Sequence, residues 1–124
     1  MTEHTTKEVE ILRNSWRKKK EKKHEREYEK RTEAYNKAKK IADYLKNSYS
    51  VKDVYLFGSL AWRSKFTDHS DIDIYVKGFP KAKSFWTALA ESERIAAPYP
   101  LSIVLDESAT QSLKDKVERR GVKI

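Results

Sequence analysis

The sequence predicts a small α/β (α+β) domain preceded by a long, basic, helical N-terminal extension. Three observations predict this class. No Gly or Pro occurs before Gly58, and the segment before it is rich in Lys, Glu, Arg and Ala, which favour helix. After residue 47, apolar runs of strand length alternate with amphipathic helical segments. The 124 residues suffice for one modest hydrophobic core.

Residues 6–47 are expected to form one long helix, with a break allowed for in its highly charged middle. Residues 1–47 therefore read as an N-terminal extension, and residues 48–124 as the core of the domain. The C-terminal part of the helix should pack on a sheet, because apolar side chains recur there at helical spacing. They are Ala34, Tyr35, Ala38, Ile41, Ala42 and Leu45.

The core should alternate strands and helices. The expected strands are residues 51–57, 71–77 and 101–105; the expected helices are residues 60–65, 81–96 and 108–119. Ser59 is the expected N-cap of the first of these helices. Gly121 should end the last one before a short apolar tail. Trp62 and Trp86 are expected in the core or at its edge.

The net charge of +8 is unevenly distributed. Residues 1–57 hold 16 Lys/Arg against 10 Asp/Glu, and residues 58–124 hold 11 against 9. A basic half of this kind favours anionic partners. The chain has no cysteine, which excludes disulfides and thiolate metal sites. No long apolar stretch suggests a membrane span or a signal peptide, so we expect a cytoplasmic protein with no membrane partner.

Two acids interrupt the strand expected at residues 71–77. Side chains alternate between the faces of a strand, so Asp71, Asp73 and Tyr75 should point away from the core. The two carboxylates then lie about 7 Å apart at Cα. Such a pair can share a hard cation such as Mg²⁺, which also binds phosphates. The other interpretation is the solvent face of an ordinary edge strand.

A Gly-Ser pair precedes these acids by a short spacing. Gly58 lets the backbone approach a ligand closely, and Ser59 opens a helix whose N–H groups can bind an anion. Alone, the pair indicates only a turn. Together with Asp71 and Asp73, it predicts a polyphosphate site beside carboxylates that bind its metal.

The segment from Gly58 to Asp73 resembles the signature of the minimal nucleotidyltransferases, a branch of the DNA polymerase beta superfamily. The matching residues are Gly58, Ser59, Asp71 and Asp73, with eleven residues between the two halves. The resemblance covers about residues 35–124. It implies a small mixed sheet flanked by helices and an enzyme that transfers a nucleotidyl group, such as AMP from ATP, to an acceptor hydroxyl. Two Mg²⁺ ions would be held by Asp71 and Asp73, with Gly58 and Ser59 at the phosphates.

Some members of this family are antitoxins that add adenylyl groups to a HEPN ribonuclease toxin. The resemblance therefore implies a HEPN-type protein partner in a toxin–antitoxin pair. A transferase acting on RNA is a further alternative, although the chain lacks the extra domain that such enzymes use to hold RNA.

One position departs from the family pattern. The third carboxylate usually stands on the next strand, and Ser102 occupies that place here. Asp106 shares the face of Ser102 but lies roughly 13 Å further along an extended strand. The chain is therefore either an active transferase or a degenerate nucleotide-binding or protein-interaction module.

Several basic residues have two interpretations. Arg63 and Lys65 either bind the triphosphate or the acceptor, or are surface charges. The basic run at residues 17–23 is either a solvated helix or a docking arm for RNA or for a protein partner. Ser70 is expected to stabilise its loop, and His69 to lie on the surface.

Overall fold

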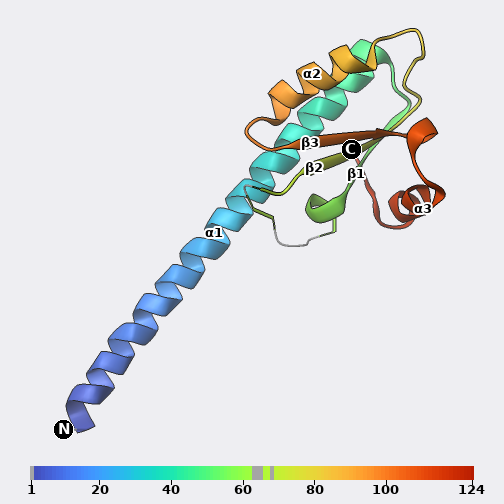
Figure 1. The fold of residues 1–124 in the computed structure, drawn as a ribbon. Helices are drawn as coiled ribbons and strands as arrows, with labels where there is room; N and C mark the ends of the chain where they lie inside the picture. Colours follow the sequence, from blue (N-terminus) through green and yellow to red (C-terminus); the bar gives the residue numbers. More distant parts are fainter. Residues whose placement is uncertain (1, 63–65, 68) are drawn as a thin grey trace.

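The computed structural model describes residues 2–62, 66–67 and 69–124, with side chains described from residue 25 onward. The described part of the chain forms one α+β unit from which a long helix projects (Figure 1). The main elements are α1 (Thr2–Tyr49), β1 (Asp53–Phe57), β2 (Ile72–Lys77), α2 (Phe85–Ala96), β3 (Leu101–Leu105), α3 (Gln111–Arg120) and β4 (Val122–Lys123). Short 3-10 turns, η1 (Gly58–Leu60) and η2 (Asp106–Ser108), follow β1 and β3.

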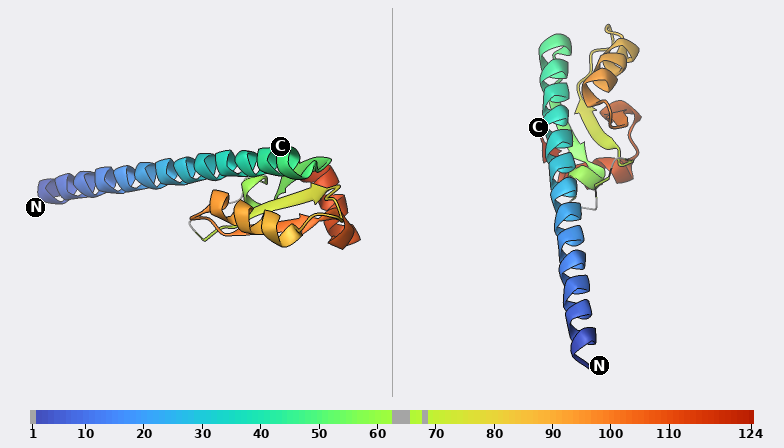
Figure 2. Two further views of the ribbon diagram at one scale, coloured as in Figure 1. Left: turned by 90° about the horizontal axis from the view of Figure 1, so that it is seen from above. Right: turned by 90° about the vertical axis from the view of Figure 1, so that its left-hand side faces the viewer.

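Helix α1 is longer than expected and continuous. It runs through the charged middle without the break that the sequence allowed, because no Gly or Pro interrupts its good helix formers. Its C-terminal third packs on the sheet, and its N-terminal half extends well beyond the domain (Figure 2). The predicted apolar stripe is confirmed, with Tyr35 only partly buried. Its fully buried members are Ala34, Ala38, Ile41, Ala42 and Leu45.

The sheet is mixed and has the strand order β3-β2-β1-β4. Strand β1 pairs antiparallel with β2 and with β4, whereas β2 and β3 run parallel and are connected through α2. The apolar tail after Gly121 thus adds a two-residue edge strand. The mixed sheet and its helices confirm the expected fold class.

The two faces of the sheet differ. The face toward α1 carries the buried core side chains of β1 and β2, which are Val54, Leu56, Ile72, Ile74 and Val76. The opposite face carries Asp73 and Tyr75 together with their register partners on β1 and β3. Tyr75 lies on the face opposite to the core side chains of β2, as expected, but only 2% of it is accessible. Its ring packs against Tyr55, with centroids 6.3 Å apart, and burial raises its pKa.

The starts of α2 and α3 were predicted four and three residues too early. Ser84 caps α2 by accepting a hydrogen bond from the Thr87 amide at 3.3 Å, and Thr110 caps α3 in the same way from Leu113 at 3.2 Å. Trp86, expected in the core or at its edge, is instead 75% exposed on α2. No helix among the described residues is both long enough and apolar enough to span a bilayer.

Candidate functional site

Gly58 directly follows β1, and its backbone lies against the carboxylate of Asp73. Its φ is +74°, a left-handed conformation that glycine adopts without steric cost. A Cβ at this position would meet the Asp73 side chain, with its Cγ only 3.0 Å away. The antiparallel register explains the approach, because Phe57 pairs with Asp73. The fold therefore brings the two halves of the Gly-Ser and Asp-x-Asp pattern into contact.

The turn after Gly58 differs from the expected helix over residues 60–65 as far as residue 62, and residues 63–65 lie outside the described part of the chain. Its 3-10 segment begins at Gly58 itself, with Phe57 at the N-cap position and no side-chain cap. Ser59 is consequently inside the turn, and its predicted N-cap role is wrong. The carbonyl of Gly58 accepts hydrogen bonds from the amides of Ala61 and Trp62, at 3.1 and 2.9 Å.

Arg31 on α1 contacts this turn, and sequence reasoning missed it. Its Nη1 donates to the carbonyl oxygens of Ser59 and Leu60, at 3.3 and 3.0 Å. The signal was present in the helical spacing, because Arg31 stands one turn before Ala34 and continues the core-facing stripe. A basic side chain that continues an apolar stripe faces the domain, and its N–H groups then need hydrogen-bond acceptors where the helix contacts the domain.

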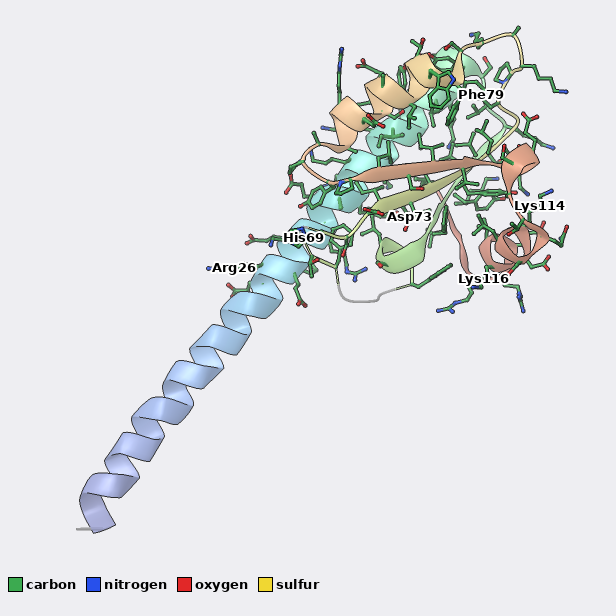
Figure 3. All side chains as sticks on the ribbon, viewed as in Figure 1. Arg26, His69, Asp73, Phe79, Lys114 and Lys116 are labelled. Atoms are coloured by element: carbon green, nitrogen blue, oxygen red, sulfur yellow. The ribbon has the colours of Figure 1, made fainter. Side chains whose placement is uncertain are left out.

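Asp71 and Asp73 occupy different environments. Asp71 is exposed just before β2, while Asp73 is partly buried on the strand, near the middle of the labelled view in Figure 3. Burial, and to a smaller extent the negative charge of Asp71, raises the pKa of Asp73 to about 6. A carboxylate in that situation gains from a bound cation, since the cation neutralises a charge that water only partly solvates.

Ser102 lies directly beside Asp73 on the sheet, since the two residues are paired in the parallel register of β2 and β3. A side chain at position 102 therefore lies on the same face of the sheet as that of Asp73. Asp106 does not replace it. It begins η2 beyond the Val76–Leu105 pair, at the other end of β3, where its charge acts on Tyr75. Among the described residues, no group of three or more His, Cys, Asp or Glu is arranged to hold a metal ion.

Side chains of the segment just before Asp71 hydrogen-bond to one another and to its backbone at the described residues. The Ser70 hydroxyl accepts a hydrogen bond from the Thr67 amide at 2.9 Å, which confirms the expected role of Ser70 in the loop. His69 is exposed, as expected. Arg63 and Lys65, the predicted phosphate or acceptor ligands, lie outside the described residues.

Trp62 connects the turn to α3. Its indole Nε1 donates to the carbonyl of Arg120 at 3.1 Å, and the Arg120 guanidinium lies over the ring, 5.0 Å from its centroid. The Phe57 ring is 6.4 Å from that of Trp62. These contacts give the turn a second anchor, at the end of α3, and place Trp62 at the edge of the fold rather than in its core.

The site thus combines the close approach of Gly58 to Asp73, the carboxylates of Asp71 and Asp73, and the hydroxyl of Ser102. Two carboxylates with a neutral third ligand can hold one hard cation beside a phosphate. The chain is similar to the family described as "Polymerase beta, Nucleotidyltransferase", whose model matches residues 39–124. No curated protein matches the chain.

Proposed function

The chain belongs to the polymerase beta nucleotidyltransferase family, and from this premise we propose that it transfers AMP from ATP to a hydroxyl of a macromolecular acceptor. The observation that carries this proposal is the contact between Gly58 and the Asp73 carboxylate. It joins a backbone segment suited to phosphate with a side chain suited to the metal of a nucleotide.

In this proposal Asp71 and Asp73 hold Mg²⁺, and Gly58 and Ser59 bind the β- and γ-phosphates. The residues fit one such cation, because the partly buried Asp73 and the adjacent Asp71 offer oxygen ligands whose mutual repulsion a cation relieves. A bound Mg²⁺ would supply neutralisation of phosphate charge. The family resemblance implies a second ion, for which Ser102 offers only a neutral oxygen.

The reaction is a displacement at the α-phosphorus. A bond forms between the acceptor oxygen and the α-phosphorus, the bond from that phosphorus to the bridging oxygen breaks, and pyrophosphate leaves. The hydroxyl proton has to pass to a base. A serine does not accept it near pH 7, so we expect transfer to be slow compared with an enzyme that has a carboxylate at position 102.

The proposed acceptor is a partner protein, and the family resemblance points to a HEPN-type toxin. The basic, projecting α1 supports a docking role, with RNA as the competing partner.

Labelled ATP tests the proposal most directly. With Mg²⁺, a co-expressed partner protein should acquire the label, and Asp71→Ala with Asp73→Ala should abolish it. Asp43→Ala with Asp115→Ala, two exposed carboxylates outside the motif, is the matched control and should leave labelling intact. Labelling that survives the motif double variant would refute the proposed roles.

A second candidate is a nucleotide-binding or protein-interaction module without transferase activity. Ser102 supports it, because a neutral side chain stands beside the carboxylate that is proposed to hold the metal. Ser102→Asp distinguishes the two, with the neutral, similarly sized Ser102→Asn as control. A module with a degenerate site should gain transfer from aspartate alone, whereas an active enzyme should label its acceptor before any substitution.

A further inference from the structure

Arg31 is placed behind the turn that bears Gly58 and Ser59. It lines a cavity of about 230 Å³ together with Leu56, Leu60 and Val122. Leu56 pairs with Ile74, so its side chain is on the face of the sheet opposite to that of Asp73. Arg31 therefore reaches the turn from the side away from the carboxylates.

The guanidinium binds the two carbonyl groups that follow that of Gly58. The Gly58 carbonyl is taken by two amides within the turn, whereas those of Ser59 and Leu60 accept from Arg31. By holding both of them, one planar donor fixes the orientation of the two peptide planes that follow Ser59 and Leu60.

Arg31 is itself held in place. Its guanidinium lies over the ring of Phe66, 5.9 Å from the centroid, and Phe66 is 1% exposed. Two residues further along α1, Glu33 accepts a hydrogen bond from the Tyr99 hydroxyl at 3.2 Å. The contact with Phe66 thus joins Arg31 to the segment before Asp71, while that of Glu33 is made to the segment before β3. The family model begins at residue 39, so Arg31 lies outside the part of the chain that it describes.

We propose that Arg31 is a positioning residue for the phosphate-binding turn, acting through the carbonyls of Ser59 and Leu60. This inference rests on the proposed function for its nucleotide readout, but the effect on the backbone of the turn is independent of it. Loss of Arg31 leaves two carbonyls without their charged donor and frees the peptide planes around Ser59. Triphosphate binding then weakens, because the turn has to be ordered again each time a ligand binds.

Four variants separate this role from general stabilisation. Arg31→Ala removes the donors, while Arg31→Lys keeps the charge but loses the planar fork. Arg26→Ala removes an equal charge from an exposed position on the same helix (Figure 3). Glu33→Ala breaks the neighbouring contact with Tyr99 without touching the turn.

Hydrogen exchange of the full-length protein measures the turn directly. In Arg31→Ala, the amides of Ala61 and Trp62 should exchange about tenfold faster, as expected when a charge-assisted hydrogen bond is lost. Arg31→Lys should restore part of the protection. Arg26→Ala and Glu33→Ala should leave these amides unchanged. Equal exchange in wild type and both Arg31 variants would overturn the inference, whether or not the protein binds nucleotide.

Calorimetry with Mg-ATP and with Mg-AMP gives the second readout. Arg31→Ala should weaken Mg-ATP binding about tenfold and Mg-AMP binding much less, since only ATP carries the β- and γ-phosphates. A wild-type protein that binds neither nucleotide would refute the proposed function and leave the exchange result to decide the role of Arg31. Unchanged Mg-ATP affinity in a folded Arg31→Ala would refute the positioning role at the site. If Arg31→Ala does not fold, the same comparisons apply to Arg31→Lys.

Discussion

At the scale of single residues, the site depends on a carboxylate that the fold keeps partly out of water. A raised pKa in the folded state means that folded protein holds the Asp73 proton more tightly than the unfolded chain does. The free energy of unfolding therefore falls as the pH rises from about 4 to about 6, and it stays lower above that range.

Asp73→Asn should remove this penalty. At pH 7.5 we expect the variant to be more stable than wild type by about 1–3 kcal/mol, and at pH 4 by much less. Urea denaturation at both pH values measures the difference. Asp71→Asn, which removes the exposed carboxylate of the pair, should raise the free energy of unfolding by less. A variant no more stable than wild type at pH 7.5 would contradict the burial of this charge.

Gly58→Ala tests the close approach. The left-handed φ and the collision with Asp73 should together cost about 1–3 kcal/mol of stability and should weaken Mg-ATP binding. Gly78→Ala is the matched control, since its φ is +76° and its added Cβ would meet Lys52 at 2.8 Å, outside the motif. It should lose similar stability but keep its nucleotide affinity. Denaturation and calorimetry on both variants separate strain from function, and equal nucleotide affinity in both would contradict the assignment.

The sequence indicated some of these residues and not others, for a physical reason. Gly58, Asp71 and Asp73 lie within 16 residues, and the alternation along a strand is enough to place the acids on one face. Ser102 is paired with Asp73 in the register of β2 and β3, and its role as the position of the third acid stays a prediction. Arg31 acts on a turn that begins 27 residues later, and only the packing of α1 on the domain brings them together.

At the scale of elements, small residues determine how closely α1 packs on the sheet. Ala34 and Ala38 are fully buried on its inner side, which lets the helix approach closely. That approach brings Arg31 within reach of the turn after β1. Periodicity predicted this helix face and the strands, whereas helix starts were misjudged because Ser84 and Thr110 act as N-caps.

Ala38→Leu should push α1 away from the sheet. We expect a loss of about 1–3 kcal/mol from overpacking, together with faster exchange in the turn that Arg31 holds. Asn36→Leu, at an exposed position on the same helix, adds a similar side chain and should change neither quantity. Denaturation and hydrogen exchange check both variants. Unchanged stability in Ala38→Leu would show that the helix is packed less tightly than described.

At the scale of the whole molecule, a domain and a projecting part of α1 can be distinguished. The buried core, among residues with described side chains, begins at Ala34. The N-terminal half of α1 runs out past the domain (Figures 1 and 2). The composition of the chain, 38% hydrophobic and 37% charged, suits a modest core joined to a solvated segment.

Deletion of residues 1–24 should therefore leave the domain folded. We expect the free energy of unfolding to change by less than about 0.5 kcal/mol and Mg-ATP affinity to be retained, while labelling of a partner protein is lost. Deletion of residues 1–36 removes Arg31 and Ala34 as well, and should impair both stability and nucleotide binding. Denaturation, calorimetry and labelling of the two shortened proteins give the comparison. Partner labelling that survives the shorter deletion would exclude the projecting helix as a docking element.

The uninterrupted course of α1 also sets a length scale. Its 48 residues correspond to roughly 72 Å, of which about 44 Å precedes Arg31 at 1.5 Å per residue. A continuous helix of this length sets the distance between a partner bound at its N-terminal end and the carboxylates of Asp71 and Asp73. A bound macromolecule would then present for modification only those hydroxyls that lie at the matching separation, so selectivity would follow from span as well as from chemistry.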